Sequence, residues 1–174
     1  NLARGPYVWG KAEAERLVTE FCAANGIEQR QIRLGPLVDF ENFTPPGRLG
    51  REVGPLFVAM GLPGNPLSVC DVHTAAQVIR YYLTDFEQAP AMLNLVESPQ
   101  PTRGDLVRRL RTARPELRFM WLPFPIVRAI SATLKLVLKL VKPGSKPLDL
   151  YSAFASESYD ASLADKIIRK ARGG

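Results

Sequence analysis

The sequence predicts a mixed α/β fold, because helical and strand-like segments alternate along it. A helical pattern over residues 6–25 is followed by a short apolar strand over 31–38. A second strand and helix follow at 67–79, and a third strand, at 91–97, precedes a helix over 102–113. A helix followed by a short apolar strand is half of an α/β crossover unit.

The composition is that of an ordinary soluble globular protein, with 46% hydrophobic and 23% charged residues. Its 174 residues suit one domain, or one domain and a fragment of another. The net charge of +6 is uneven: between residues 101 and 143 there are ten Lys or Arg and two acidic residues. No nucleic-acid-binding motif accompanies this basic stretch, so we expect a solvated basic face and no nucleic-acid partner.

The two cysteines, Cys22 and Cys70, lie far apart in apolar patterns and form neither a metal-binding spacing nor a disulfide framework. They predict buried, reduced thiols in a cytoplasmic protein. The first residues lack an initiator Met and an apolar targeting core. We therefore expect the chain to begin inside a larger protein.

The first helix is expected to start near Pro6 and to end at Gly26, a residue typical of helix C-termini. Its apolar stripe predicts an amphipathic helix with one buried face. The stripe includes Leu17, Val18, Phe21 and Cys22.

Tyr7 and Lys11 are four residues apart, which places them on one face of this helix, one turn from each other. An ammonium beside a phenol stabilises the phenolate, so Tyr7 could pass a proton to or from a hydroxyl or carbonyl oxygen. Lys11 could also donate to a second ligand group, such as ribose hydroxyls. The alternative is an ordinary surface helix with an exposed Tyr and Lys.

The later elements have local signals. Asp71 is predicted to cap the helix that follows it, and His73, the single histidine, to be a surface residue. Thr102 is predicted to cap the helix over 102–113, with Leu106, Val107 and Leu110 facing inward. A strand is expected at 117–122 and a short helix at 161–171.

Residues 123–142 predict a helix with a broad apolar face and a basic face formed by Arg128, Lys135, Lys139 and Lys142. The longest stretch without charge in or beside this helix, 119–127, has nine residues, far short of a membrane span of about twenty. The helix could lie on a membrane surface, or cover an apolar substrate pocket. The alternative is a helix packed on the domain with solvated lysines.

The sequence around Pro6, Tyr7, Gly10, Lys11 and Glu15 resembles the active-site helix of the extended short-chain dehydrogenase/reductases, the NAD(P)-dependent epimerase/dehydratase family. The resemblance continues at 67–79, which is similar to a structural Val-x-Asp-Val element of that family.

The strand after the helix is also similar to the family, whose corresponding strand ends in an Arg-Pro-Gly-like turn. Here the turn reads Arg33-Leu34-Gly35-Pro36-Leu37-Val38, so Leu34 stands where Pro is usual. Pro36 and Asp39 stand where nucleotide-sugar enzymes of the family tend to carry Asn and Gly. These departures make a sugar-nucleotide epimerase less favoured.

The resemblance implies a fold of two parts. Residues 1–38 would be the C-terminal part of a Rossmann-like doubly wound sheet, and residues 39–174 a small α/β substrate domain with a strand returning to the main sheet. The N-terminal glycine-rich half would be absent, because no glycine cluster lies between a strand and a helix. The chain alone is therefore expected to be inactive and to bind NAD(P) weakly.

The resemblance also implies roles for residues. Tyr7 would be the general acid/base, and Lys11 would hold the ribose. With them, Gly35, Pro36, Leu37 and Val38 would line the nicotinamide end of NAD or NADP. In the turn-rich segment 39–66, Arg48 and Arg51 would be available to an anionic substrate group, or would form a solvated arginine pair. No metal is expected.

The implied function is that of an NAD(P)-dependent oxidoreductase, epimerase or dehydratase acting on a carbinol or carbonyl carbon of a small-molecule or lipidic substrate. The alternative is a non-catalytic reductase-like binding module that contacts a membrane peripherally through residues 123–142. A fragment without the central strands of the sheet would expose apolar helix faces and an unpaired strand edge, which predicts a homo-oligomer associated through the first helix.

Overall fold

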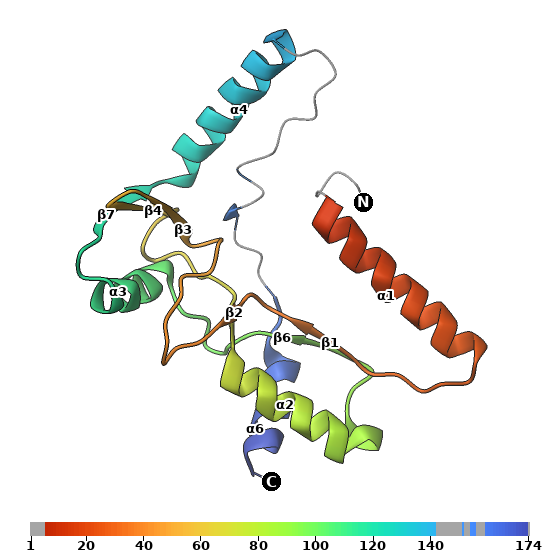
Figure 1. Cartoon of the computed structure of the whole chain (residues 1–174). Helices are drawn as coiled ribbons and strands as arrows, with labels where there is room; N and C mark the ends of the chain where they lie inside the picture. Colours follow the sequence, from red (N-terminus) through yellow and green to blue (C-terminus); the bar gives the residue numbers. More distant parts are fainter. Residues whose placement is uncertain (1–5, 142–150, 152–153, 156–158, 174) are drawn as a thin grey trace.

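The structure, a computed structural model, describes residues 6–141, 151, 154–155 and 159–173 and is a mixed α/β fold (Figure 1). In chain order the elements are α1 (Pro6–Ala24), β1 (Gln31–Leu34), β2 (Leu37–Val38), β3 (Gly50–Val53), β4 (Leu56–Met60), β5 (Cys70–Asp71), α2 (Val72–Thr84), the 3-10 helix η2 (Phe86–Gln88), β6 (Met92–Leu95), α3 (Arg103–Ala113), β7 (Arg118–Leu122), α4 (Phe124–Val141) and α6 (Ser162–Gly173).

The described strands form three small sheets rather than one continuous sheet. β1 pairs in parallel with β6, so that Gln31 lies opposite Met92, and β2 pairs in parallel with β5. β3 and β4 form an antiparallel hairpin, to which β7 adds in parallel through β4. The α/β class predicted from the sequence is confirmed, while a doubly wound Rossmann sheet stays a prediction.

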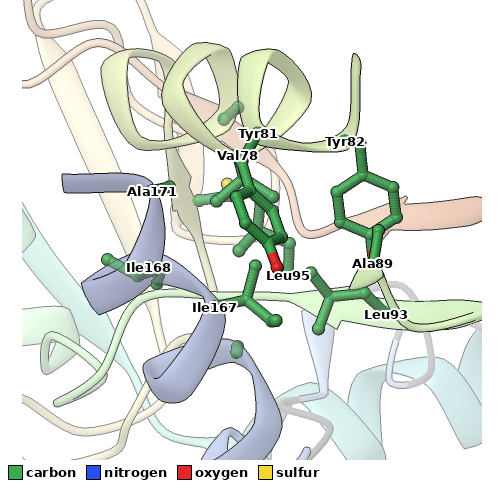
Figure 2. Close-up of a cluster of buried hydrophobic side chains, with 12 residues drawn as sticks. Val78, Tyr81, Tyr82, Ala89, Leu93, Leu95, Ile167, Ile168 and Ala171 are labelled. Atoms are coloured by element: carbon green, nitrogen blue, oxygen red, sulfur yellow. The ribbon is translucent and has the colours of Figure 1, made fainter. Parts of the chain in front are cut away.

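A first hydrophobic core lies between α2, β6 and α6 (Figure 2). The side chains of Val78, Leu93 and Leu95 are almost completely buried there. The rings of Tyr81 and Tyr82 meet edge to face, with 6.2 Å between their centroids. Each fully buried Leu or Val stabilises the fold by about 1.5–3 kcal/mol relative to an exposed one, so this cluster fixes α6 against α2 although almost 80 residues separate them in sequence.

A second core lies between α3 and the sheet formed by β3, β4 and β7. As predicted, Leu106, Val107 and Leu110 of α3 point inward and are buried. A capping box begins this helix: the Thr102 hydroxyl accepts from the Asp105 backbone N–H at 3.1 Å, and Asp105 accepts from the Thr102 N–H at 2.9 Å.

Strand β3 and the 3-10 helix η2 are elements that the sequence did not predict, and the single strand expected over 31–38 is divided into β1 and β2. The residues of β3 fall in the turn-rich segment 39–66, in which only 56–60 had a strand-like pattern. A Cβ atom at Gly50 would lie 2.2 Å from the carbonyl oxygen of Val58 on β4, so the glycine permits a close strand approach instead of marking a loop. Gly54, at φ +57°, makes the turn of the hairpin.

Helix α1 is followed by Gly26, whose φ of +64° stops the helix as predicted, but the expected buried face is not found in the described part of the chain. Leu17 is 52% exposed and Phe21 is 62% exposed. Polar contacts join α1 to β1: Arg33 pairs with Glu15, and the Gln31 side-chain amide donates to the Thr19 hydroxyl at 2.9 Å. The prediction of a buried apolar face is therefore wrong, because the apolar residues are exposed and it is the polar Glu15 and Thr19 that contact β1.

Self-association through the uncovered side of α1 stays a prediction. Changing Leu17→Gln together with Phe21→Gln should shift the chain toward monomer in sedimentation velocity, because burial of exposed Leu and Phe drives association. The control is Ile79→Gln with Leu83→Gln, two exposed apolar residues of α2. A wild-type chain that sediments as a monomer at all concentrations would contradict this prediction.

The capping box of α3 should stabilise the fold, and the part that Asp105 contributes should depend on pH. Thr102→Ala should lower the free energy of unfolding by about 1 kcal/mol, whereas Thr112→Ala on the exposed side of α3 should change it little. Hydrogen bonds from the Thr102 hydroxyl and backbone hold the pKa of Asp105 below its ordinary value of 3.8. The stabilisation that the Asp105 carboxylate gives to the folded state is therefore complete above pH 3.8 and is lost as the pH falls through the lower folded-state pKa.

Urea titrations of wild type and Asp105→Ala check the sign. The difference in unfolding free energy should be constant near neutral pH and should shrink below pH 3.8. A difference that grows on acidification would show that Asp105 does not stabilise the helix as a carboxylate.

Candidate functional site

Tyr7 and Lys11 lie in the first two turns of α1, one turn apart, as their spacing predicted. The Lys11 Nζ atom is 5.8 Å from the centroid of the Tyr7 ring. Tyr7 is 75% exposed, and Lys11 is also exposed. A phenol and an ammonium on one face of a helix can both donate to the oxygens of one ligand.

The segment from Gly35 to Val38 crosses between two parallel strand pairs. The Gly35 N–H donates to the Leu95 carbonyl and the Cys70 N–H donates to the Pro36 carbonyl, each at 2.9 Å. A Cβ atom at Gly35 would lie 3.1 Å from the Val96 Cγ1 atom, which explains the glycine. The segment therefore leaves the carboxyl ends of β1 and β6, the end of a parallel sheet at which α/β proteins bind ligands.

The structure does not bring the two predicted parts of the cofactor site together. In Figure 1 the first turn of α1 lies well apart from β1 and β2. Leu37 is exposed, whereas Val38 is buried in the second core. Arg33, at the start of the predicted turn, pairs with Glu15 of α1. A combined site of Tyr7, Lys11 and residues 35–38 stays a prediction.

The two arginines of the expected substrate side differ in environment. Arg48 lies in the turn before β3 and is half-buried, whereas Arg51 lies on β3, opposite Val58 of β4, and is exposed. The backbone carbonyl of Arg48 accepts a hydrogen bond from Arg103 at 2.6 Å. Only Arg51 has the exposure expected of a group that meets a ligand.

The burial of Arg103 is not predicted by the sequence, because this arginine lies in a basic stretch that is expected to be solvated. Arg103 is completely buried. Its guanidinium donates to the carbonyls of Arg48 at 2.6 Å, Met60 at 3.0 Å and Phe154 at 2.7 Å. Its Cζ atom also lies 5.0 Å from the centroid of the Phe124 ring, a cation–π contact.

Burial, and then the positive charge of Arg48, lower the pKa of Arg103 to about 10. The guanidinium is therefore still charged at neutral pH, and its charge is compensated by carbonyl dipoles among the described residues. One sequence signal, the glycine that directly follows Arg103, could have pointed to its burial. A Cβ atom at Gly104 would lie 3.1 Å from the Pro63 carbonyl, so the start of α3 packs closely against the loop before β5.

Other predicted roles agree with the structure. The Asp71 carboxylate accepts from the Thr74 N–H at 3.1 Å, so Asp71 is a helix cap. The side chain of His73 is 58% exposed, as a surface residue should be. Burial, followed by the charge of Glu97, raises the pKa of the buried Cys70 thiol to about 12, so it is not a thiolate nucleophile at neutral pH.

Within residues 6–141, 151, 154–155 and 159–173, no three His, Cys, Asp or Glu side chains gather as metal ligands. No helix in the same residues is long and apolar enough to cross a membrane. A surface hollow between α2 and α6 is lined by residues outside the predicted site, among them Arg80, Thr84 and Lys170.

Comparison of the chain with protein-family models, with curated protein sequences and with solved structures gave no match. Any assignment of function therefore depends on the residues and their geometry.

The buried guanidinium gives a sharp stability prediction. Arg103→Lys keeps the charge but cannot reach three carbonyls at once, and each buried carbonyl left unpaired costs about 1–3 kcal/mol. We expect the free energy of unfolding to fall by at least about 2 kcal/mol. Arg111→Lys, which also changes an arginine beside an aromatic ring, is the control and should be nearly neutral. Equal stability of the two variants would contradict the role given to Arg103.

Proposed function

We propose that this chain provides the catalytic Tyr–Lys pair and the substrate side of an NAD(P)-dependent oxidoreductase of the extended short-chain reductase type. One observation supports it above the others. Tyr7 and Lys11 present a phenol and an ammonium, side by side and exposed, at the start of a helix that leads directly into a parallel strand.

The donor set fits one part of a dinucleotide. The Lys11 ammonium suits the hydroxyls of a ribose, because it can donate hydrogen bonds to oxygen, and the Tyr7 hydroxyl beside it would face the reacting oxygen. The pyrophosphate group is different, since the described residues contain no glycine-rich turn between a strand and a helix N-terminus. The proposal therefore gives Tyr7 and Lys11 the ribose and nicotinamide end of the cofactor.

The proposed chemistry is proton transfer by Tyr7. In oxidation of a carbinol, the Tyr7 phenolate takes the proton of the substrate hydroxyl while the carbinol carbon loses a hydride, and a carbonyl is formed. A bound oxidised nicotinamide supplies the acceptor for that hydride. In the reverse direction the Tyr7 phenol donates its proton to the carbonyl oxygen. In both directions Lys11 would hold the ribose hydroxyls by donating hydrogen bonds to them.

The exposed arginine of the expected substrate side supports a substrate with an anionic group. Arg51 would pair with that group away from the reacting carbon. The hydrogen bond from Arg103 to the Arg48 carbonyl would hold in place the turn that precedes the strand of Arg51. The substrate class remains a carbinol or carbonyl compound, small or lipidic.

The test is Tyr7→Phe in the full-length product of the gene, assayed with NAD and NADP. Removal of the proton-transferring hydroxyl should lower kcat by about 10²–10⁴-fold and leave the cofactor Kd largely unchanged, as measured by fluorescence titration. Lys11→Met should instead weaken cofactor binding as well. Normal turnover of Tyr7→Phe would refute the assignment.

A matched control separates loss of chemistry from loss of folding. Tyr81→Phe removes a phenolic hydroxyl from the first core, where Tyr81 is buried between α2 and α6 (Figure 2). It should leave kcat unchanged. A comparable loss of kcat in this variant would show that hydroxyl removal acts through stability and not through proton transfer.

A further inference from the structure

Helix α4 exposes a continuous apolar side. Ile126, Ile130, Leu134 and Val137 recur at helical spacing, and all four are exposed. Beside this row, Leu136 is 61% exposed and Leu140 is 74% exposed. In Figure 1 the helix extends away from the sheets, so its outer turns have no neighbour among the described elements. Monomeric proteins seldom leave so many large apolar side chains uncovered on one helix.

The base of α4 is held firmly. Val127 is buried, and the Phe124 ring meets the Tyr151 ring edge to face at 5.9 Å between centroids. The Arg103 Cζ atom lies 5.0 Å from the centroid of the same Phe124 ring. A helix fixed at one end and uncovered along the rest presents its apolar side at a set angle to the body.

The charge around the helix is of one sign. From residue 117 to residue 148 the sequence has six Lys or Arg and no acidic residue. Arg128 is exposed on α4, and Lys135 and Lys139 follow it in sequence by seven and eleven residues, which is the spacing of one helical side. The helix therefore combines an apolar side with a basic side.

We propose that α4 docks on the surface of an anionic phospholipid membrane and lies in its interface without crossing it. Leu136, Leu140 and the Ile126–Val137 row would enter the boundary between headgroups and acyl chains, and the cations would meet lipid phosphates. A second copy of the chain is a poorer occupant, because two such helices would bring only positive charges together. This docking is independent of the chemistry proposed for Tyr7.

Co-sedimentation of the full chain with vesicles tests the proposal, using phosphatidylcholine alone and phosphatidylcholine mixed with phosphatidylserine. We expect binding to the mixed vesicles that weakens as salt is added. Leu136→Gln with Leu140→Gln should reduce the partition coefficient at least about tenfold. Arg128→Gln with Lys135→Gln and Lys139→Gln should reduce it about 100-fold on mixed vesicles and remove the preference for phosphatidylserine.

The matched control is Leu17→Gln with Phe21→Gln on α1, the other exposed apolar helix side. This variant should bind vesicles as the wild type does, and circular dichroism should show every variant folded. Binding lost in the α1 variant but kept in the α4 variant would overturn the proposal. Equal binding to both kinds of vesicle would also overturn the proposal. The same holds for a wild-type dimer that does not bind vesicles and that dissociates when Leu136 and Leu140 are changed.

Discussion

The buried guanidinium of Arg103 holds together the part of the chain that contains β3, β4, α3 and the start of α4. Among the described residues, its three carbonyl partners are Arg48 in the turn before β3, Met60 at the end of β4, and Phe154. A cation away from water is costly unless hydrogen bonds replace its hydration, so these segments have to stay where they can supply carbonyls. The cation–π contact between Arg103 and the Phe124 ring also joins the first turn of α4 to the guanidinium.

Two glycines make this convergence sterically possible. At Gly61, with φ +85°, a Cβ atom would lie 2.7 Å from the Phe124 ring, and at Gly104 it would lie 3.1 Å from the Pro63 carbonyl. The end of β4, the start of α3 and the start of α4 can therefore approach one another around the guanidinium. Glycines at 61 and 104 look like loop markers in the sequence, but their role here is to allow close packing.

The sequence predicted what is local and missed what depends on distant partners. Asp71 and Thr102 cap the helices they were expected to cap, because a cap involves only residues three positions apart. The burial of Arg103 depends on a contact with residue 154, which no local pattern records. Strand β3 has a local partner, β4, but its glycines are typical of loops, and the close strand approach that Gly50 permits is not visible in the sequence. The candidate site divides in the same way: the Tyr7–Lys11 pair follows from helix spacing, whereas its relation to residues 35–38 is a tertiary question.

The two uncovered helix sides differ in charge, and that difference separates their expected partners. On α1 Arg16 pairs with both Glu13 and Glu20, so the apolar side is bordered by compensated charges that suit another protein surface. On α4 the border is cationic only, which suits a layer of phosphates. Because Arg103 joins the base of α4 to the turn that carries Arg48, a membrane that receives α4 would also fix the position of the proposed substrate side. A lipidic carbinol, one of the substrate classes compatible with the Tyr7 chemistry, would then be presented from the surface on which the protein rests.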